Sequence, residues 1–160
     1  MNCSELRLTE IVRIAIFLAS ASNISVPRNV CCNSVATATP FSGSPVLSFA
    51  LTPDTENEVR LSLVPTRKIT NARQAGGTIY THDLQMSVEN PPTSVSEALN
   101  ALAGKDFHVL YTHADGSKSV SYSLPNASNI DMEATLSSVC TMTLKAKLLS
   151  MSDAIMITTP

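Results

Sequence analysis

Apolar and polar residues alternate along much of this chain with a period of two, the pattern of a β-strand that buries one face. The clearest example is YTHDLQMSVE, whose apolar face carries Tyr80, His82, Leu84, Met86 and Val88. Similar alternation runs through residues 11–18 (IVRIAIFL), 59–64 (VRLSLV) and 138–149 (SVCTMTLKAKLL). These segments predict half-buried strands, each with one face on a core and the other in water or against a polar partner.

The dipeptide Asp115-Gly116 predicts the turn of a β-hairpin, because both residues tolerate the positive φ of a two-residue hairpin loop. Such a loop would set three aromatic–aliphatic pairs on one face of the hairpin: Tyr111 with Val120, Val109 with Tyr122, and Phe107 with Leu124. In this interpretation Asp115 is a turn residue and not a catalytic one.

One segment, near residues 94–103, predicts a short α-helix. Ser94 followed by Glu97 has the spacing of a capping box, and Gly104 lies where a helix-terminating glycine belongs. The apolar stripe is formed by Val95, Ala98, Leu99 and Leu102. Together these patterns predict a mainly β fold, a mostly antiparallel β-sandwich or barrel of about seven strands with one flanking helix.

The whole chain, residues 1–160, is expected to form one β-rich domain with an N-terminal segment and a long loop at about 65–78. Long loops in compact domains are usually functional or mobile. This one is basic, and we interpret it either as solvated or as an arm that meets an acidic surface on a neighbouring copy or partner. The predicted interface residues are Arg67, Lys68 and Arg73, with Gly76 and Gly77 as the hinge. A second long link, residues 124–138, carries Asp131 and Glu133.

Composition argues against several classes of partner. Charged residues make up 15% of the chain and the formal net charge is only -2, so nothing indicates binding to nucleic acid or to an anionic membrane. The chain has no Trp, which leaves little for base stacking or for an aromatic sugar platform. Arg13 interrupts the first apolar run, and the residues before it are not basic overall, so we expect synthesis in the cytoplasm without an export signal.

The histidines and cysteines do not form a recognisable metal or catalytic pattern. His82 lies on the apolar face of its strand and is expected to be a packed core residue. His108 and His113 lie five residues apart on one predicted strand, hence on opposite faces, and cannot bind one metal together. The cysteines show no C-x-x-C spacing and are expected to be free thiols, although their even number permits disulfides: Cys3, Cys31, Cys32 and Cys140. We therefore predict no catalytic, metal or cofactor-binding residues and no cofactor.

The runs GGTIYTHDLQMSV, LNALAGKDFHVLYTHADGS, SLPNASNI and CTMTLKAK resemble a class of small bacteriophage virion proteins of Bacteroides-type phages. The resemblance covers about residues 11–27 and 77–148, and its motifs are structural; residues 28–76 have no counterpart in it. The elements that carry it are Tyr80-His82-Leu84, Leu99-Leu102-Gly104, Phe107 to Tyr111, Asp115-Gly116, and Thr141 to Leu144.

The resemblance implies a ring-forming structural subunit of a phage tail, or of the connector between portal and tail, that is not an enzyme. It implies a homo-oligomer of about six or twelve copies that docks to other tail or portal proteins, with DNA only as passing cargo and no membrane. The implied location is the virion, after synthesis in the cytoplasm of a bacterial host. Two alternatives stay open: a surface β-sandwich module that binds sugar or protein, and a small enzyme on a β scaffold.

Overall fold

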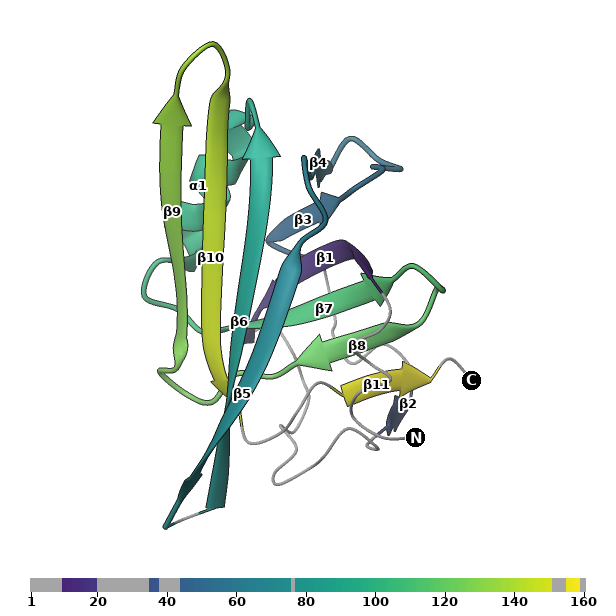
Figure 1. Ribbon diagram of the computed structural model, residues 1–160, viewed down its shortest axis with the longest axis vertical. Helices are drawn as coiled ribbons and strands as arrows, with labels where there is room; N and C mark the ends of the chain where they lie inside the picture. The colour runs from purple at the N-terminus through teal and green to yellow at the C-terminus, as the bar shows by residue number, and fades with distance from the viewer. Residues whose placement is uncertain (1–9, 20–34, 38–43, 76, 151–154, 159–160) are drawn as a thin grey trace.

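The computed structural model describes residues 10–19, 35–37, 44–75, 77–150 and 155–158. In these residues eleven strands form two sheets, and one helix lies beside them (Figure 1). The strands of one sheet run across those of the other. The prediction of a mainly β fold with one short helix is confirmed, although the structure has more strands than the seven expected.

The larger sheet has seven strands in the order β2-β11-β8-β7-β1-β3-β4. Its pairs are antiparallel except β11 with β2 and β3 with β4, which are parallel. The strands are β1 (Ile11–Leu18), β2 (Val35–Thr37), β3 (Leu47–Ala50), β4 (Glu58–Arg60), β7 (Phe107–His113), β8 (Lys118–Ser121) and β11 (Ile155–Thr158).

The smaller sheet is fully antiparallel and has four strands in the order β5-β6-β10-β9. Its strands are β5 (Thr66–Gln74), β6 (Gly77–Glu89), β9 (Ser128–Leu136) and β10 (Cys140–Ser150). The apolar faces predicted for β6 and β10 are confirmed, because Leu84, Met86 and Val88 are buried on β6 and Leu144 and Leu148 on β10.

One hydrophobic core joins both sheets and the helix. It takes Ile14 and Ile16 from β1, Phe49 from β3, Val109 and Tyr111 from β7, and the apolar faces of β6 and β10. The helix α1 (Thr93–Leu102) adds Val95, Ala98 and Leu102, with Leu99 packed at the margin, which is the stripe predicted from sequence.

Two segments predicted as long links are strands. Most of the expected loop at about 65–78 is β5, which pairs with β6 from Thr66↔Gln85 to Gln74↔Gly77, so this prediction was wrong. The second link contains β9, which pairs with β10 along its whole length. Both are edge strands, because in the described residues each pairs with one neighbouring strand only.

The helix starts differently from the prediction. Pro92 is the N-cap residue and no side chain caps the helix, so the predicted capping box of Ser94 and Glu97 does not form. A proline that fixes φ can begin a helix without a side-chain cap. The C-terminal end of the helix agrees with the prediction. Gly104 follows the C-cap residue Ala103 and has a φ of 71°.

The β7–β8 hairpin is confirmed, but its register differs by one residue from the prediction. Tyr111 pairs with Ser119 and Val109 with Ser121, in place of Val120 and Tyr122. The loop closes through the Ser117 carbonyl, which accepts from the His113 N–H at 2.8 Å. The loop therefore has one more residue than expected, and a positive φ at its last position is the known feature of three-residue hairpin loops.

That position is Gly116, with φ of 89° and nothing within 4 Å of where a Cβ would lie. Gly116→Ala is expected to lower the free energy of unfolding by about 1 kcal/mol, a purely conformational cost. Gly116→Asn is the matched control and should cost less, because Asn tolerates the left-handed region. Urea unfolding of the three proteins tests this; equal stability of wild type and Gly116→Ala would contradict the loop geometry.

Arg13, which interrupts the first apolar run, lies near the start of β1 and is held by ion pairs. Its guanidinium pairs with Asp54 at 2.5 Å and with Glu58, and also donates to the Thr52 carbonyl at 3.1 Å. Burial alone would raise the pKa of Glu58, but the hydrogen bonds from Arg13 and from the Asp54 N–H outweigh it and lower that pKa. Arg13 therefore fixes the β3–β4 connection to β1.

Candidate functional site

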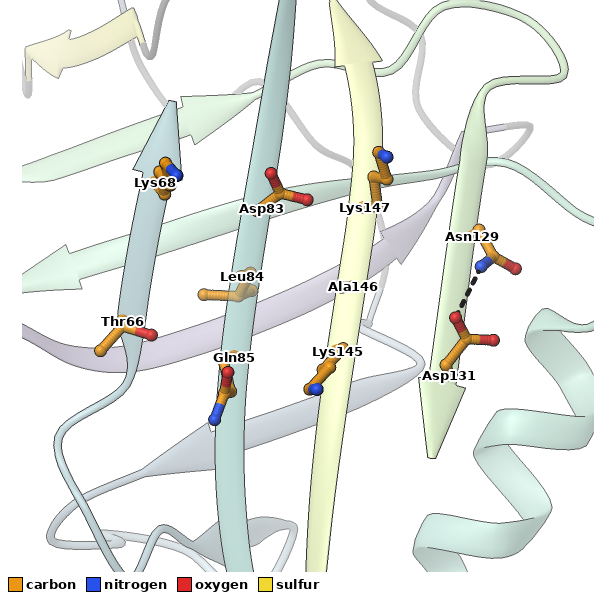
Figure 2. Close-up of a pocket in the computed structure, with 10 residues that line it drawn as sticks. All are labelled: Thr66, Lys68, Asp83, Leu84, Gln85, Asn129, Asp131, Lys145, Ala146 and Lys147. Carbon is orange, nitrogen blue, oxygen red and sulfur yellow. Dashed lines mark hydrogen bonds between the residues drawn. The ribbon is translucent and has the colours of Figure 1, made fainter. Parts of the chain in front are cut away.

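The outer face of the four-stranded sheet is polar and carries charges of both signs (Figure 2). It contains a shallow hollow of about 470 Å³, lined by residues of all four strands. The polar lining residues are Thr66 and Lys68 from β5, Asp83 and Gln85 from β6, Lys145 and Lys147 from β10, and Asn129 and Asp131 from β9.

The register of the strands sets these charges in alternating rows. Asp83 lies between Lys68 and Lys147 on the neighbouring strands, and Lys145 stands opposite Asp131. The Asn129 amide donates to the Asp131 carboxylate at 3.0 Å, as Figure 2 shows. Such a surface can receive a polar ligand or a partner protein, because it presents charged groups of both signs and hydrogen-bonding side chains.

The β9 edge of this sheet is exposed and partly apolar. Met132 is 49% exposed, Leu136 is 83% exposed and Val139, in the β9–β10 turn, is 39% exposed. In the described part of the chain, β9 pairs only with β10, so its other side presents unpaired backbone groups. An edge of this kind is a template for a further strand.

The β5–β6 hairpin projects beyond the rest of its sheet (Figure 1). β10 reaches only Tyr80 on β6, through the pair Ser150↔Tyr80, whereas β5 continues to pair with β6 as far as Gly77. Arg73 lies on this extension and is exposed.

The predicted interface residues do not lie on one surface. Arg67 and Lys68 are neighbours on a strand, so their side chains lie on opposite faces. Arg67 faces inward: its guanidinium carbon lies 4.6 Å from the centre of the Tyr111 ring, and it donates to Ser119 Oγ at 3.1 Å. Lys68 lines the outer hollow. Gly77 begins β6 with φ of 127°, and Gly76 lies outside the described residues.

Beneath Arg67 lies a buried polar cluster between the sheets. His82 Nδ1 and Ser121 Oγ lie 2.7 Å apart, and Ser121 Oγ donates to the Tyr111 hydroxyl at 3.0 Å. Next to them, His113 Nε2 and Ser119 Oγ lie 2.8 Å apart. Burial raises the pKa of Tyr111, so its hydroxyl stays protonated and can both donate and accept.

All three histidines are buried, and two of them, His82 and His113, belong to this cluster. His82 is buried and hydrogen-bonded, as predicted for a core residue. His108 and His113 are also buried, and His108 Nδ1 accepts from the Ser123 N–H at 3.0 Å. Ser119 and Ser121 have no exposed surface, so neither offers a nucleophile to a bound substrate. The His82–Ser121 pair joins the two sheets, and the His113–Ser119 pair lies within the seven-stranded sheet.

The two serines of this cluster, Ser119 and Ser121, were not predicted from the sequence. They belong to a run of serines with a period of two in SKSVSYS, and that spacing was the available signal. It indicated a polar face on β8, and a polar face that is buried needs hydrogen-bonding partners from another strand.

Among the described residues, no group of three or more His, Cys, Asp or Glu side chains is arranged to hold a metal ion. Cys140 is a free thiol, and the other three cysteines lie outside those residues. None of the helices in the described ranges is long and apolar enough to cross a membrane. Comparison of the chain with protein-family models, with curated proteins and with solved structures found no match.

Proposed function

We propose that this chain is a structural subunit of a bacteriophage virion, a ring-forming component of the tail or of the portal–tail connector. It acts by self-assembly and by docking to neighbouring virion proteins around the DNA channel. The sequence resemblance described above motivates the virion setting, and the form of the four-stranded sheet supports the assembly role.

The observation that carries the proposal is the pair of edges of the four-stranded sheet. β5 and β9 each have nine residues, and neither pairs with more than one strand in the described ranges. A protein that works alone usually blunts long edges with bulges or covers them. Here β9 exposes Met132 and Leu136, and β5 belongs to a projecting hairpin. Both features suit a subunit whose edges are covered by neighbours.

The hollow on the outer face supports a second candidate, a surface module that binds sugar or protein. Its polar side chains converge from four strands, as a site for a polar ligand requires. Its lining has no aromatic side chain, however, and aromatic rings are the usual platform for a sugar. A protein is therefore a better ligand for this face than a sugar, and a protein ligand is consistent with the proposed role in assembly.

Quantitative mass spectrometry of phage particles banded from the source culture tests the virion proposal. The chain is expected to co-band with particles at a fixed copy number, near six or twelve per portal. Its absence from banded particles would overturn the virion proposal and favour the binding module. A comparison with a known non-virion phage protein from the same lysate controls for carry-over.

A further inference from the structure

The two edges of the four-stranded sheet are opposite in charge. β5 (TRKITNARQ) has three basic residues and no acidic one, whereas β9 (SNIDMEATL) has two acidic residues and no basic one. The basic side chains are Arg67, Lys68 and Arg73, and the acidic ones are Asp131 and Glu133. The two strands are equal in length.

We infer that β9 of one copy pairs with β5 of the next copy, so that the four-stranded sheet continues from subunit to subunit. This inference rests on the proposed function, since it names the contact through which copies assemble. β5 is antiparallel to β6, β6 to β10, and β10 to β9. A neighbouring copy placed in the same orientation therefore presents its β5 antiparallel to β9, which is the arrangement that extends an antiparallel sheet.

The faces of the two strands restrict the register. Lys68 lies on the outer face with Asp83, and Glu133 lies on the outer face with Thr143. A register that sets Lys68 opposite Glu133 also sets Ile69 opposite Met132 on the inner face. It overlaps residues 66–73 of one copy with 128–135 of the other, nearly the full length of both strands. A shift by one residue would put Lys68 on the wrong face.

Glu133 is the acidic residue best placed for this contact. On β10, Asp131 already stands opposite Lys145, whereas Glu133 stands opposite Thr143. Glu133 is exposed, and so is Lys68. A direct cross-strand pair of opposite charges stabilises a sheet, while like charges directly opposite destabilise it.

A groove on the inner side of β9 suits the apolar pair. It has a volume of about 200 Å³ and lies between the C-terminal end of α1 and β9, with Leu99, Ile130 and Met132 in its lining. Ile69 of the next copy would approach Met132 at this groove. The contact would cover apolar surface that β9 exposes in the single chain.

Charge also decides between two ways of pairing. Two β9 edges would bring four acidic residues together, and two β5 edges would bring six basic residues together. Both symmetric contacts are repelled, so the contact between unlike edges is favoured. Contacts between unlike edges are heterologous, and they give closed rings where the rotation closes. Charged residues on an edge strand can also prevent it from pairing with another strand. Charges of any sign would serve that purpose, however, so it does not explain why one edge is basic and the other acidic.

A charge exchange on the full-length chain tests the inference. Sedimentation velocity at low salt is expected to show that Lys68→Glu and Glu133→Lys each weaken self-association by about tenfold or more. The double variant Lys68→Glu/Glu133→Lys should associate more tightly than either single variant, because opposite charges again face each other between copies. Its association stays below that of the wild type, because the new carboxylate at position 68 lies opposite Asp83 of its own chain. The matched controls are Arg60→Glu and Glu56→Lys, exposed residues near β4 that should leave association unchanged.

Two results would overturn the inference. One is a wild-type chain that stays monomeric at the highest concentration tested; the other is association that the single reversals do not change or that is no tighter in the double variant than in the single ones. Far-ultraviolet circular dichroism of each variant separates lost assembly from lost folding. Mass spectrometry of particles tests the virion role independently. If the chain is found in particles but the single charge reversals leave self-association unchanged, this contact is excluded and the proposed function stands.

Discussion

Tyr111→Ala is expected to lower the free energy of unfolding by about 3–5 kcal/mol, the range for removing a large buried aromatic side chain. Tyr111 has no exposed surface and belongs to the core shared by both sheets. Its ring also supports the Arg67 guanidinium, and its hydroxyl accepts from Ser121 Oγ at 3.0 Å. Alanine would leave a cavity between the sheets and take one partner from a buried polar cluster.

Tyr111→Phe is the matched control because it keeps the ring and removes only the hydroxyl. It should cost about 1 kcal/mol, the usual net value of one hydrogen bond, since Ser121 Oγ keeps His82 as a partner. Urea unfolding followed by circular dichroism measures all three proteins. If the two variants were equally destabilised, the hydroxyl and not the ring would hold the sheets together, contrary to the packing described here.

The strands that carry most of the core were predictable because their patterns are local. β6 and β10 alternate apolar and polar residues over ten or more positions, and the structure buries the predicted faces. β5 was not predictable in this way. Its inner face carries Arg67, Ile69, Asn71 and Arg73, a single apolar residue among polar ones, because an edge strand at a projecting hairpin has little core to cover.

β9 was missed although its signal was present. Ile130, Met132, Ala134 and Leu136 alternate with polar residues, as they do in a strand. The preceding Pro125-Asn126 and the acidic pair favoured a loop. The structure shows that the proline precedes the strand, which begins at Ser128.

The predicted interface depended on the loop expected at about 65–78 and not on β9. In a loop, Arg67 and Lys68 can form one basic patch. Once they are strand residues, adjacent side chains must separate to opposite faces. The buried cluster could not be predicted from the sequence for a different reason. His82 comes from the four-stranded sheet and Ser121 from the seven-stranded sheet. No spacing in the sequence indicates which strands of two packed sheets face each other.

His108 is expected to make the fold less stable in acid, by about 3 kcal/mol in total. Burial lowers the pKa of His108 from 6.5 to about 4, although the nearby Asp106 carboxylate acts in the opposite direction. His108 Nδ1 accepts from the Ser123 N–H at 3.0 Å, and a protonated ring could not accept there. Between about pH 6.5 and pH 4 the unfolded chain therefore binds a proton that the folded chain does not.

The contribution of His108 to the free energy of unfolding is complete above pH 6.5 and is lost as the pH falls toward 4. Urea unfolding at several values between pH 7.5 and 4.5 measures it against His108→Asn. That variant cannot titrate, and its amide oxygen can still accept from Ser123; its smaller side chain lowers stability equally at every pH. The wild type should lose its advantage over the variant as the solution is acidified, because the other titrating groups are common to both. A constant difference between the two proteins would show that His108 titrates alike in the folded and unfolded chains, and that its burial does not favour the neutral ring.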